Sequence, residues 1–324
     1  MVEIRVKGER FMMPNGSIVK VNRQEMFETP LPGKQPMKIP RYWKRVLIDE
    51  QGRPVKHFSD YEFNRSRACL WAYGWSDLSP EAAEQHGLER AQSILRRVRM
   101  NNPIPRQYSY PDRPLREEVI ERDPHDRWVI TRNAYGSLVL NTRDAMFIDI
   151  DQSWQIGPGL INKLLRRRSL VSPEQVIEQT RKALQKWPNF SGRLYRTAAG
   201  FRLLVTHATF EPESAIAHEL MNACQADAKY KLLCRKQQCF RARLTPKPWR
   251  CDCVIRADFL YPCETPEEVN AMNEWLEMYA RGSAGWATCH LMAIIGDESV
   301  APSIAPLVDL HDQYSGVGTN LPLA

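Results

Sequence analysis

The stretch "AMFIDIDQ", residues 145–152, places two aspartates two positions apart in an apolar, β-prone run. Side chains alternate between the two faces of a strand, so Asp149 and Asp151 are expected on one face and the aliphatic residues on the other. Two like charges side by side are costly unless a cationic group meets them. The strand therefore predicts either a metal site or a pairing with arginines from neighbouring strands.

The segments that follow this strand alternate in a recognisable order. A helix with a capping box (Ser172 with Gln175) is expected after it, then two strands around a turn, a second helix and a fourth strand. The segments are residues 172–187, 192–197, 201–207, 212–224 and 239–244. This βαββαβ order is typical of the α+β ferredoxin-like or RRM-like fold, whose helices cover one sheet face and leave the other open. The first strand would lie between the third and the fourth.

The remaining segments flank this core. Residues 1–105 are predicted to be an accessory region, irregular and Pro-rich up to about residue 60, with one long helix that begins after Ser79 and ends in Arg96, Arg97 and Arg99. Residues 106–324 are predicted to hold the core, a preceding hairpin and a C-terminal extension of one helix and one strand. The hairpin spans 127–142, and the extension covers 265–280 and 286–296.

Arginines are expected on the same sheet face as the two aspartates. Arg202 alternates with apolar residues in the third strand, and Arg241 and Arg243 do so in the fourth. The Pro-stiffened loop "TPKPWR" adds Lys247 and Arg250 at the rim. Functionally, the carboxylates would bind Mg²⁺ or Mn²⁺ and the cations would bind phosphates. Structurally, the same residues would form cross-strand ion pairs.

The composition favours an anionic partner. The net charge is +7 and the pI about 9.0, which suits nucleic acid or nucleotide triphosphates. No run approaches the about 18 apolar residues of a membrane helix, and the N-terminus lacks an apolar signal core. We expect a cytoplasmic protein without a membrane partner. Eight cysteines are present. A zinc site is the less favoured reading, because the spacing lacks paired C-x2-C motifs; its residues would be Cys234, Cys239, Cys251 and Cys253.

These motifs resemble the catalytic core of the archaeo-eukaryotic primase (primase-polymerase) superfamily over about residues 145–250. "MFIDID" is similar to the family's hhhDhD strand, and Arg202 in "YRTAAGFRLLV" stands at the position of the family histidine. Asp227 in "QADAKY" matches the third acidic residue, and "FRARLTPKPWR" matches the closing basic element.

The resemblance implies metal-dependent nucleotidyl transfer. Asp149 and Asp151 would hold two divalent ions about 3.5 to 4 Å apart, and Asp227 would complete the catalytic set. The triphosphate would be bound by Arg202, Arg241, Arg243, Lys247 and Arg250. Two alternatives stay open. One is a non-catalytic nucleic-acid-binding protein with a structural Asp–Arg sheet face, and the other is a cyclase or nuclease on the same fold.

Overall fold

A computed structural model describes residues 10–12, 18–20, 37–55, 70–100, 114–151, 154–156, 168–170, 172–254 and 261–324. Within these ranges the fold is mixed α+β, with antiparallel sheets and six α-helices. Most of the Pro-rich arm before residue 37 lies outside the described residues. None of the helices in these ranges has the length and apolarity needed to span a membrane.

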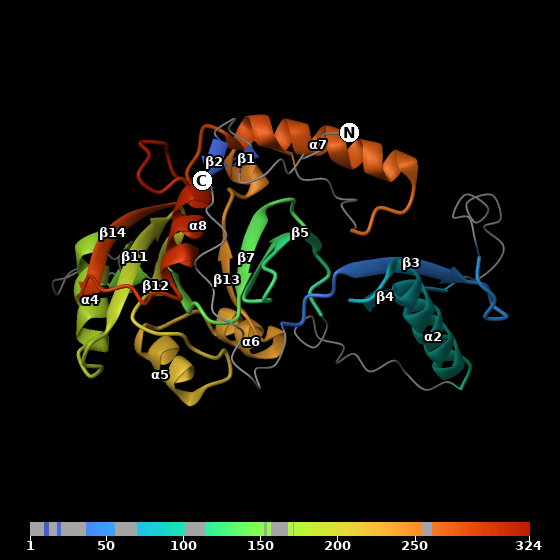
Figure 1. Cartoon of the computed structure of the whole chain (residues 1–324), viewed down its shortest axis with the longest axis horizontal. Coiled ribbons are helices and arrows are strands. Elements are labelled where there is room, and N and C mark those ends of the chain that lie inside the picture. Colours follow the sequence, from blue (N-terminus) through green and yellow to red (C-terminus); the bar gives the residue numbers. More distant parts are fainter. Residues whose placement is uncertain are drawn as a thin grey trace.

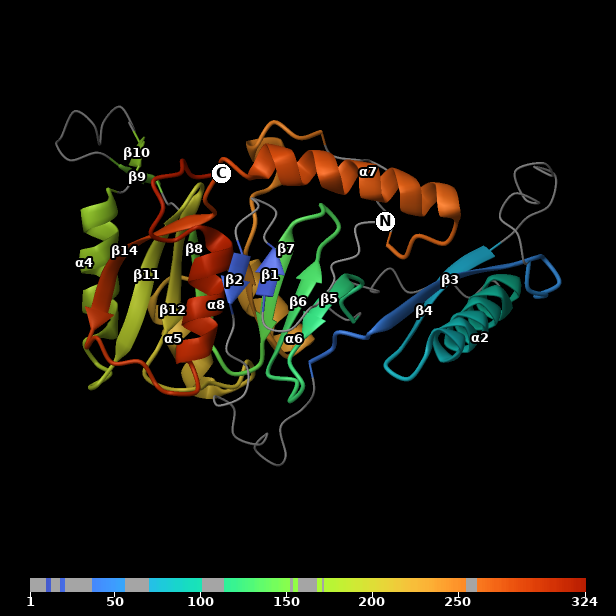
Figure 2. The ribbon, with the colours of Figure 1, turned by 45° about the horizontal axis from the view of Figure 1, so that its top comes forward.

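The first sheet contains the aspartate strand. Its strands pair antiparallel in the order β14-β11-β12-β8. Their bounds are Phe147–Asp151 for β8, Ser191–Thr197 for β11, Gly200–Val205 for β12 and Cys289–Gly296 for β14. Three helices pack against this sheet, with α8 on one face and α4 and α5 on the other (Figure 2). These helices are α4 (Pro173–Leu184), α5 (Ala215–Ala223) and α8 (Ala305–Ser315).

The second sheet follows the order β13-β7-β6-β5 and lies beside the first (Figure 1). Its strands are β5 (Glu118–Arg122), β6 (Trp128–Arg132), β7 (Leu138–Thr142) and β13 (Phe240–Arg243). Helix α6 (Ala228–Gln237) precedes β13, the short 3-10 helix η2 (Pro248–Arg250) follows it, and the long helix α7 (Pro266–Ser283) runs along one edge of the molecule.

The N-terminal part adds a third unit at one end of the molecule. Strands β3 (Tyr42–Ile48) and β4 (Leu70–Ser76) pair antiparallel, and α2 (Pro80–Arg99) packs on one side of them. A Cβ atom on Gly74 would lie 1.9 Å from the Ala83 carbonyl, so only glycine allows α2 this close. Two short ladders complete the described strands, β1 (Arg10–Met12) with β2 (Ile18–Lys20), and β9 (Trp154–Ile156) with β10 (Arg168–Leu170).

Local signals in the sequence predicted most of these elements correctly. The capping box of α4 and the Ser79 cap of α2 are present, and so are the β6–β7 and β11–β12 hairpins. Helix α7 and strand β14 form the expected C-terminal extension, although α8 then follows them. The prediction of an irregular arm up to about residue 60 was wrong for residues 42–48, which form β3.

The predicted place of β8 between the third and fourth strands is only half correct. Strand β12 does pair with β8, with Arg202 opposite Asp149. Strand β13, however, pairs with β7 in the second sheet. All five residues of β7 are buried, so its outer backbone edge needs hydrogen-bond partners, and β13 supplies them.

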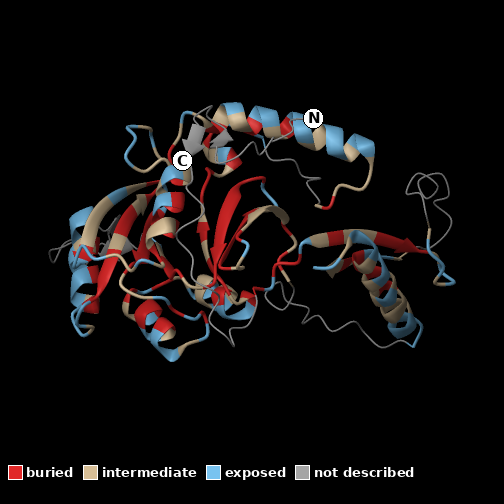
Figure 3. Cartoon of the chain, in the orientation of Figure 1, coloured by how far each residue is buried: buried red, intermediate tan, exposed pale blue. Residues whose placement is uncertain are grey.

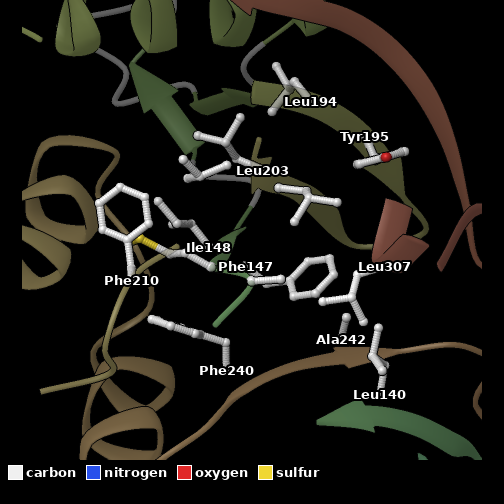
Figure 4. Close-up of a cluster of buried hydrophobic side chains, with 14 of the residues drawn as sticks. Leu140, Phe147, Ile148, Leu194, Tyr195, Leu203, Phe210, Phe240, Ala242 and Leu307 are labelled. Carbon is white, nitrogen blue, oxygen red and sulfur yellow. The ribbon is translucent and has the colours of Figure 1, made fainter. Parts of the chain in front are cut away.

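Two side chains join the sheets where β8 and β13 approach each other. The Tyr230 hydroxyl on α6 donates to the Phe147 carbonyl at 2.8 Å and accepts from the Arg241 amide at 3.3 Å. Arg202 donates to the Arg243 carbonyl at 2.9 Å. These bonds replace a direct ladder between the two strands. A single hydrophobic core also runs across the junction, from Phe147 and Ile148 to Phe240 and Leu140 (Figure 4).

The predicted open sheet face is largely covered. His311 of α8 lies 5.2 Å from the Phe147 ring and 4.8 Å from the Tyr195 ring, measured between centroids. Phe147 and Tyr195 are fully buried. Much of the inner part of this sheet is coloured as buried in Figure 3. The expectation failed because the amphipathic α8, which follows β14, supplies a second helical layer. The carboxyl end of β8, which carries the two aspartates, stays accessible.

Candidate functional site

The two aspartates share one face of β8, as the alternation predicted. Asp149 is directly opposite Arg202 on β12, and Asp151 is opposite Gly200. The Asp149 side chain is 45% exposed and Asp151 is exposed, whereas Phe147, two residues earlier on the same face, is buried. The strand thus leaves the core at this point and delivers both carboxylates to the surface.

Arg202 is the least accessible cation of this region, with only 2% of its surface exposed. Its guanidinium donates to Asp149 Oδ1 at 3.4 Å, to the Arg243 carbonyl at 2.9 Å and to His311 Nε2 at 3.2 Å. A buried guanidinium needs such acceptors because it cannot lose its charge. Arg202 therefore connects β12 with β8, β13 and α8.

A polar network continues from Arg202 into α8. Because arginine only donates, His311 Nε2 accepts, and its Nδ1–H donates to Asp312 Oδ1 at 2.9 Å. Burial, assisted by the charge of Arg202, lowers the pKa of His311 and keeps the ring neutral. Asp312 is held in turn by Arg193 at 2.9 Å. The network fixes the position of Arg202 and, through it, the inner carboxylate.

Asp227 lies close to the aspartate pair but has a local task. Its amide donates to the Asp149 carbonyl at 3.2 Å, which holds the start of α6 beside β8. Its side chain caps α6 by accepting from the Tyr230 amide at 2.7 Å. One carboxylate oxygen is thus committed to the helix, while the negative charge stays near Asp151.

Arg241 lies apart from the other predicted phosphate ligands. Its Nη2 binds both carboxylate oxygens of Glu117, at 2.7 and 2.8 Å. Glu117 is 5% exposed and also accepts from the Thr131 hydroxyl. This ion pair ties β13 to the segment before β5, so Arg241 is not part of the cluster formed around Asp149.

Arg243, Lys247 and Arg250 lie close to one another beside the aspartate strand. Burial lowers the pKa of Arg243 to about 10, the charges of Arg202 and Arg250 act in the same direction, and Asp149 opposes them. Burial also lowers the pKa of Lys247; Arg243 and Arg250 add to this shift, whereas the two aspartates counteract it. Lys247 is therefore within electrostatic range of both aspartates and Arg243 of Asp149, while Arg250 acts on these two cations.

The pKa of Asp151 is also shifted by its charged neighbours. Loss of water contact raises the pKa of Asp151, the charges of Asp227 and Asp149 raise it further, and Lys247 lowers it. Three carboxylates and four cations therefore gather at the junction of the two sheets: Asp149, Asp151, Asp227, Arg202, Arg243, Lys247 and Arg250. We call this group the junction cluster.

Two guanidinium groups of the junction cluster keep unused donors. Arg243 Nε and Arg250 Nη1 are both buried, and neither has a hydrogen-bond acceptor among the described residues. Buried donors without acceptors are costly, and cationic ones especially so. An anion bound at the cluster would satisfy both donors and relieve the cation–cation repulsion.

The residues that could hold a metal ion are the aspartate pair. In the described ranges no group of three or more His, Cys, Asp or Glu side chains is close enough to hold a metal by itself. The four cysteines considered for zinc belong to separate hydrophobic clusters: Cys251 and Cys253 pack with Trp275 and Tyr279, whereas Cys234 and Cys239 lie around α6 and β13.

Several residues of this region were missed in the sequence. His311 and Asp312 lie far along the chain from β8, and only the amphipathic pattern of 305–315 could have indicated their helix. Tyr230 and Glu117 carry no motif at all. Asp227, in contrast, stands directly before "AKYKLLCRKQ" and is a typical N-cap residue, which is the role that it has in α6. Comparison of the chain with protein-family models, curated proteins and solved structures gave no match.

Proposed function

We propose that the junction cluster binds the triphosphate of a nucleotide together with a divalent ion and carries out primase-polymerase-like nucleotidyl transfer. The observation that supports this most strongly is the pair of buried, unused guanidinium donors of Arg243 and Arg250 beside two surface carboxylates. Planar guanidinium groups match phosphate oxygens, and hard divalent ions prefer carboxylate and phosphate oxygens together.

The fold order supports the same proposal. Strand β12 lies between β8 and β11, which is the arrangement of a split β-α-β unit, and β13 runs beside β8 through the bonds of Tyr230 and Arg202. We interpret this as a ferredoxin-like core in which the fourth strand has shifted to a neighbouring sheet. The shift opens the junction in which the cluster lies.

Asp149 and Asp151 fit a divalent ion by their chemistry, since they supply oxygen ligands from one strand face, and waters and substrate phosphates complete such sites. When bound, the ion would polarise the reacting phosphoryl group and lower the pKa of an attacking hydroxyl. Arg202 keeps Asp149 in position. Asp227 adds negative charge on the same side and so strengthens cation binding there.

The cations would act on the triphosphate itself. Arg243 and Arg250 would donate to its oxygens from fixed positions, and Lys247 would neutralise charge from the Pro-bounded loop. Donors that are already oriented in a partly dry site stabilise the negative charge that develops as phosphoryl transfer proceeds. Arg241, bound to Glu117, has no part in this mechanism.

Synthesis from labelled nucleotide triphosphates on a single-stranded template, in Mg²⁺ or Mn²⁺, tests the proposal. The wild-type chain should form oligonucleotides, and Asp149→Asn or Asp151→Asn should abolish product while Asp309→Asn, at an exposed position of α8, leaves it unchanged. Metal-dependent synthesis that survives in Asp149→Asn would overturn the proposal. Product analysis also separates this reaction from a cyclase, which yields cyclic nucleotide, and from a nuclease, which yields shortened template.

One observation favours a second candidate, a non-catalytic nucleic-acid-binding protein. Arg202 is already bonded to Asp149, as a structural ion pair would be. In that case binding of nucleic acid should fall steeply with salt and be the same in Mn²⁺ and in EDTA at equal ionic strength. No nucleotide product would then form under any metal condition.

A further inference from the structure

Two aromatic rings stand exposed beside the junction cluster. Trp249, in η2 between Lys247 and Arg250, is 44% exposed, and Tyr135, in the β6–β7 turn, is 46% exposed. The rings meet edge to face with centroids 5.1 Å apart and an interplanar angle of 88°. Lys247 Nζ lies 5.2 Å from the centre of the Trp249 ring. Each ring thus keeps much of its surface in water although a cation lies close by.

The turn that carries Tyr135 is rigid. The Asn133 side chain accepts from the amides of Tyr135 and Ser137, at 2.9 and 3.2 Å. Gly136 has a φ of +85°, and a Cβ atom there would fall within 2.2 Å of the Trp275 ring of α7. A side chain at position 136 would therefore clash with α7, so this turn requires glycine.

The loop that carries Trp249 is fixed to the same support. The Pro246 carbonyl accepts from the hydroxyls of Ser137 and Tyr279, and Thr245 Oγ1 accepts from the Leu138 amide at 2.9 Å. Prolines at 246 and 248 stiffen the loop on both sides of Lys247. Both exposed rings are hence held by a common framework before any ligand arrives, which lowers the entropy lost on binding.

We propose that Trp249, supported by the Tyr135 ring that meets it edge to face, forms a stacking platform for a nucleobase whose phosphates lie on Lys247 and Arg250. Base-binding sites for single strands combine a cationic track with aromatic rings, because every base has a π-face that can stack. Here the unused Arg250 donor and the exposed Trp249 ring follow each other in the chain. The base belongs to a single strand or to a nucleotide triphosphate, since both carry a base that can stack and phosphates that bind cations.

This inference deepens the proposed function. It rests on the proposed function in one respect, namely that the junction cluster binds phosphate. The platform would place a base within reach of the cations and beside the aspartate pair. Because stacking needs no metal, the platform can be tested in EDTA, where nucleotidyl transfer does not occur. Its failure is thus distinguishable from failure of the catalytic proposal.

The test is anisotropy of a fluorescein-labelled oligodeoxythymidylate and of an abasic strand of equal length, in EDTA. The wild-type chain should bind the thymidylate about tenfold more tightly than the abasic strand, the usual size of a stacking contribution. Trp249→Ala should lose this preference at an unchanged salt slope, whereas Lys247→Ala should keep the preference and reduce the slope by about one. Trp249→Phe should retain most of the affinity for thymidylate. Trp71→Ala, which replaces a tryptophan 53% exposed on β4, should bind as the wild-type chain does.

A second arm identifies the source of the base. Here nucleotide triphosphate and inorganic tripolyphosphate are compared as competitors of the labelled strand. If the platform receives the incoming nucleotide, nucleotide triphosphate competes better than tripolyphosphate, and Trp249→Ala removes this difference. If the platform receives the strand, the two competitors are equal, and only thymidylate binds better than the abasic strand. Equal affinity of the wild-type chain for base-containing and base-free ligands in both arms would overturn the inference. So would equal losses in Trp249→Ala and Trp71→Ala.

Discussion

Replacing Arg202 by methionine separates the structural and functional roles in the junction cluster. The substitution keeps the unbranched stem of the side chain but leaves His311 Nε2 and the Arg243 carbonyl without their donor. Each buried acceptor left unpaired costs about 1 to 2 kcal/mol. The lost contact with Asp149 adds at most about 0.5 to 1 kcal/mol, because that carboxylate is 45% exposed and 3.4 Å away. We expect the free energy of unfolding to fall by about 3 kcal/mol.

Asp149→Asn should behave very differently. It removes only the half-exposed end of the same contact, so the free energy of unfolding should change by less than about 1 kcal/mol. The assay is urea unfolding of both single variants and the double variant, followed by far-UV circular dichroism, with Arg181→Met on the exposed side of α4 as control. A coupling energy above about 2 kcal/mol between the two positions, or a loss in Asp149→Asn as large as in Arg202→Met, would refute the reasoning and identify the pair as a structural salt bridge.

Three further predictions concern the frame around the cluster. Tyr230→Phe removes the hydroxyl that joins β8 to β13 and should lower the free energy of unfolding, measured by urea titration, by about 1 to 3 kcal/mol. Tyr135→Phe, at an exposed position, should lower it by less than about 0.5 kcal/mol, and equal effects of the two variants would contradict the bridging role of Tyr230. Because burial lowers the pKa of His311 in the folded chain, the unfolded chain binds the extra proton, and the free energy of unfolding should fall as the pH drops below about 6.5. His311→Gln should reduce this dependence on pH and His218→Gln should not. An unchanged dependence in His311→Gln would rule out His311 as its source. Arg241→Met removes the cation that pairs with the buried Glu117 and should lower the free energy of unfolding by about 3 kcal/mol, while the affinity for nucleotide triphosphate, measured by calorimetry, stays unchanged. A tenfold loss of triphosphate affinity in this variant would show that Arg241 belongs to the site.

The parts of the fold that are set by neighbouring residues could be predicted from the sequence. The capping box at Ser172 and Gln175, the turn at Gly200 and the alternation through Asp149 and Asp151 each depend on residues a few positions apart. The shared face of Asp149 and Arg202 on neighbouring strands was also predicted, whereas their direct pairing is seen only in the structure. These are the features on which the candidate site is built.

The features that failed depend on contacts between distant parts of the chain. Strand β13 can pair with β8 or with β7, and the choice depends on which strand edge still lacks hydrogen-bond partners. The Tyr230 hydroxyl donates to the Phe147 carbonyl at the edge of β8, and β13 pairs with β7. The alternation of Arg241 and Arg243 suggested equal roles, but Glu117, more than a hundred residues away in the chain, forms its ion pair with Arg241 and not with Arg243. Both outcomes require tertiary structure, because nothing near these residues in sequence distinguishes them.

Calorimetry with Mn²⁺ and a non-hydrolysable nucleotide triphosphate tests the central claim most directly, namely that the aspartate pair and the cations of the junction form one ligand site. The wild-type chain should bind Mn²⁺ and the triphosphate with positive coupling. The double variant Asp149→Asn, Asp151→Asn should lose Mn²⁺ binding, and Asp309→Asn should bind as wild type does. Undiminished, triphosphate-dependent Mn²⁺ binding in the double variant would contradict the account.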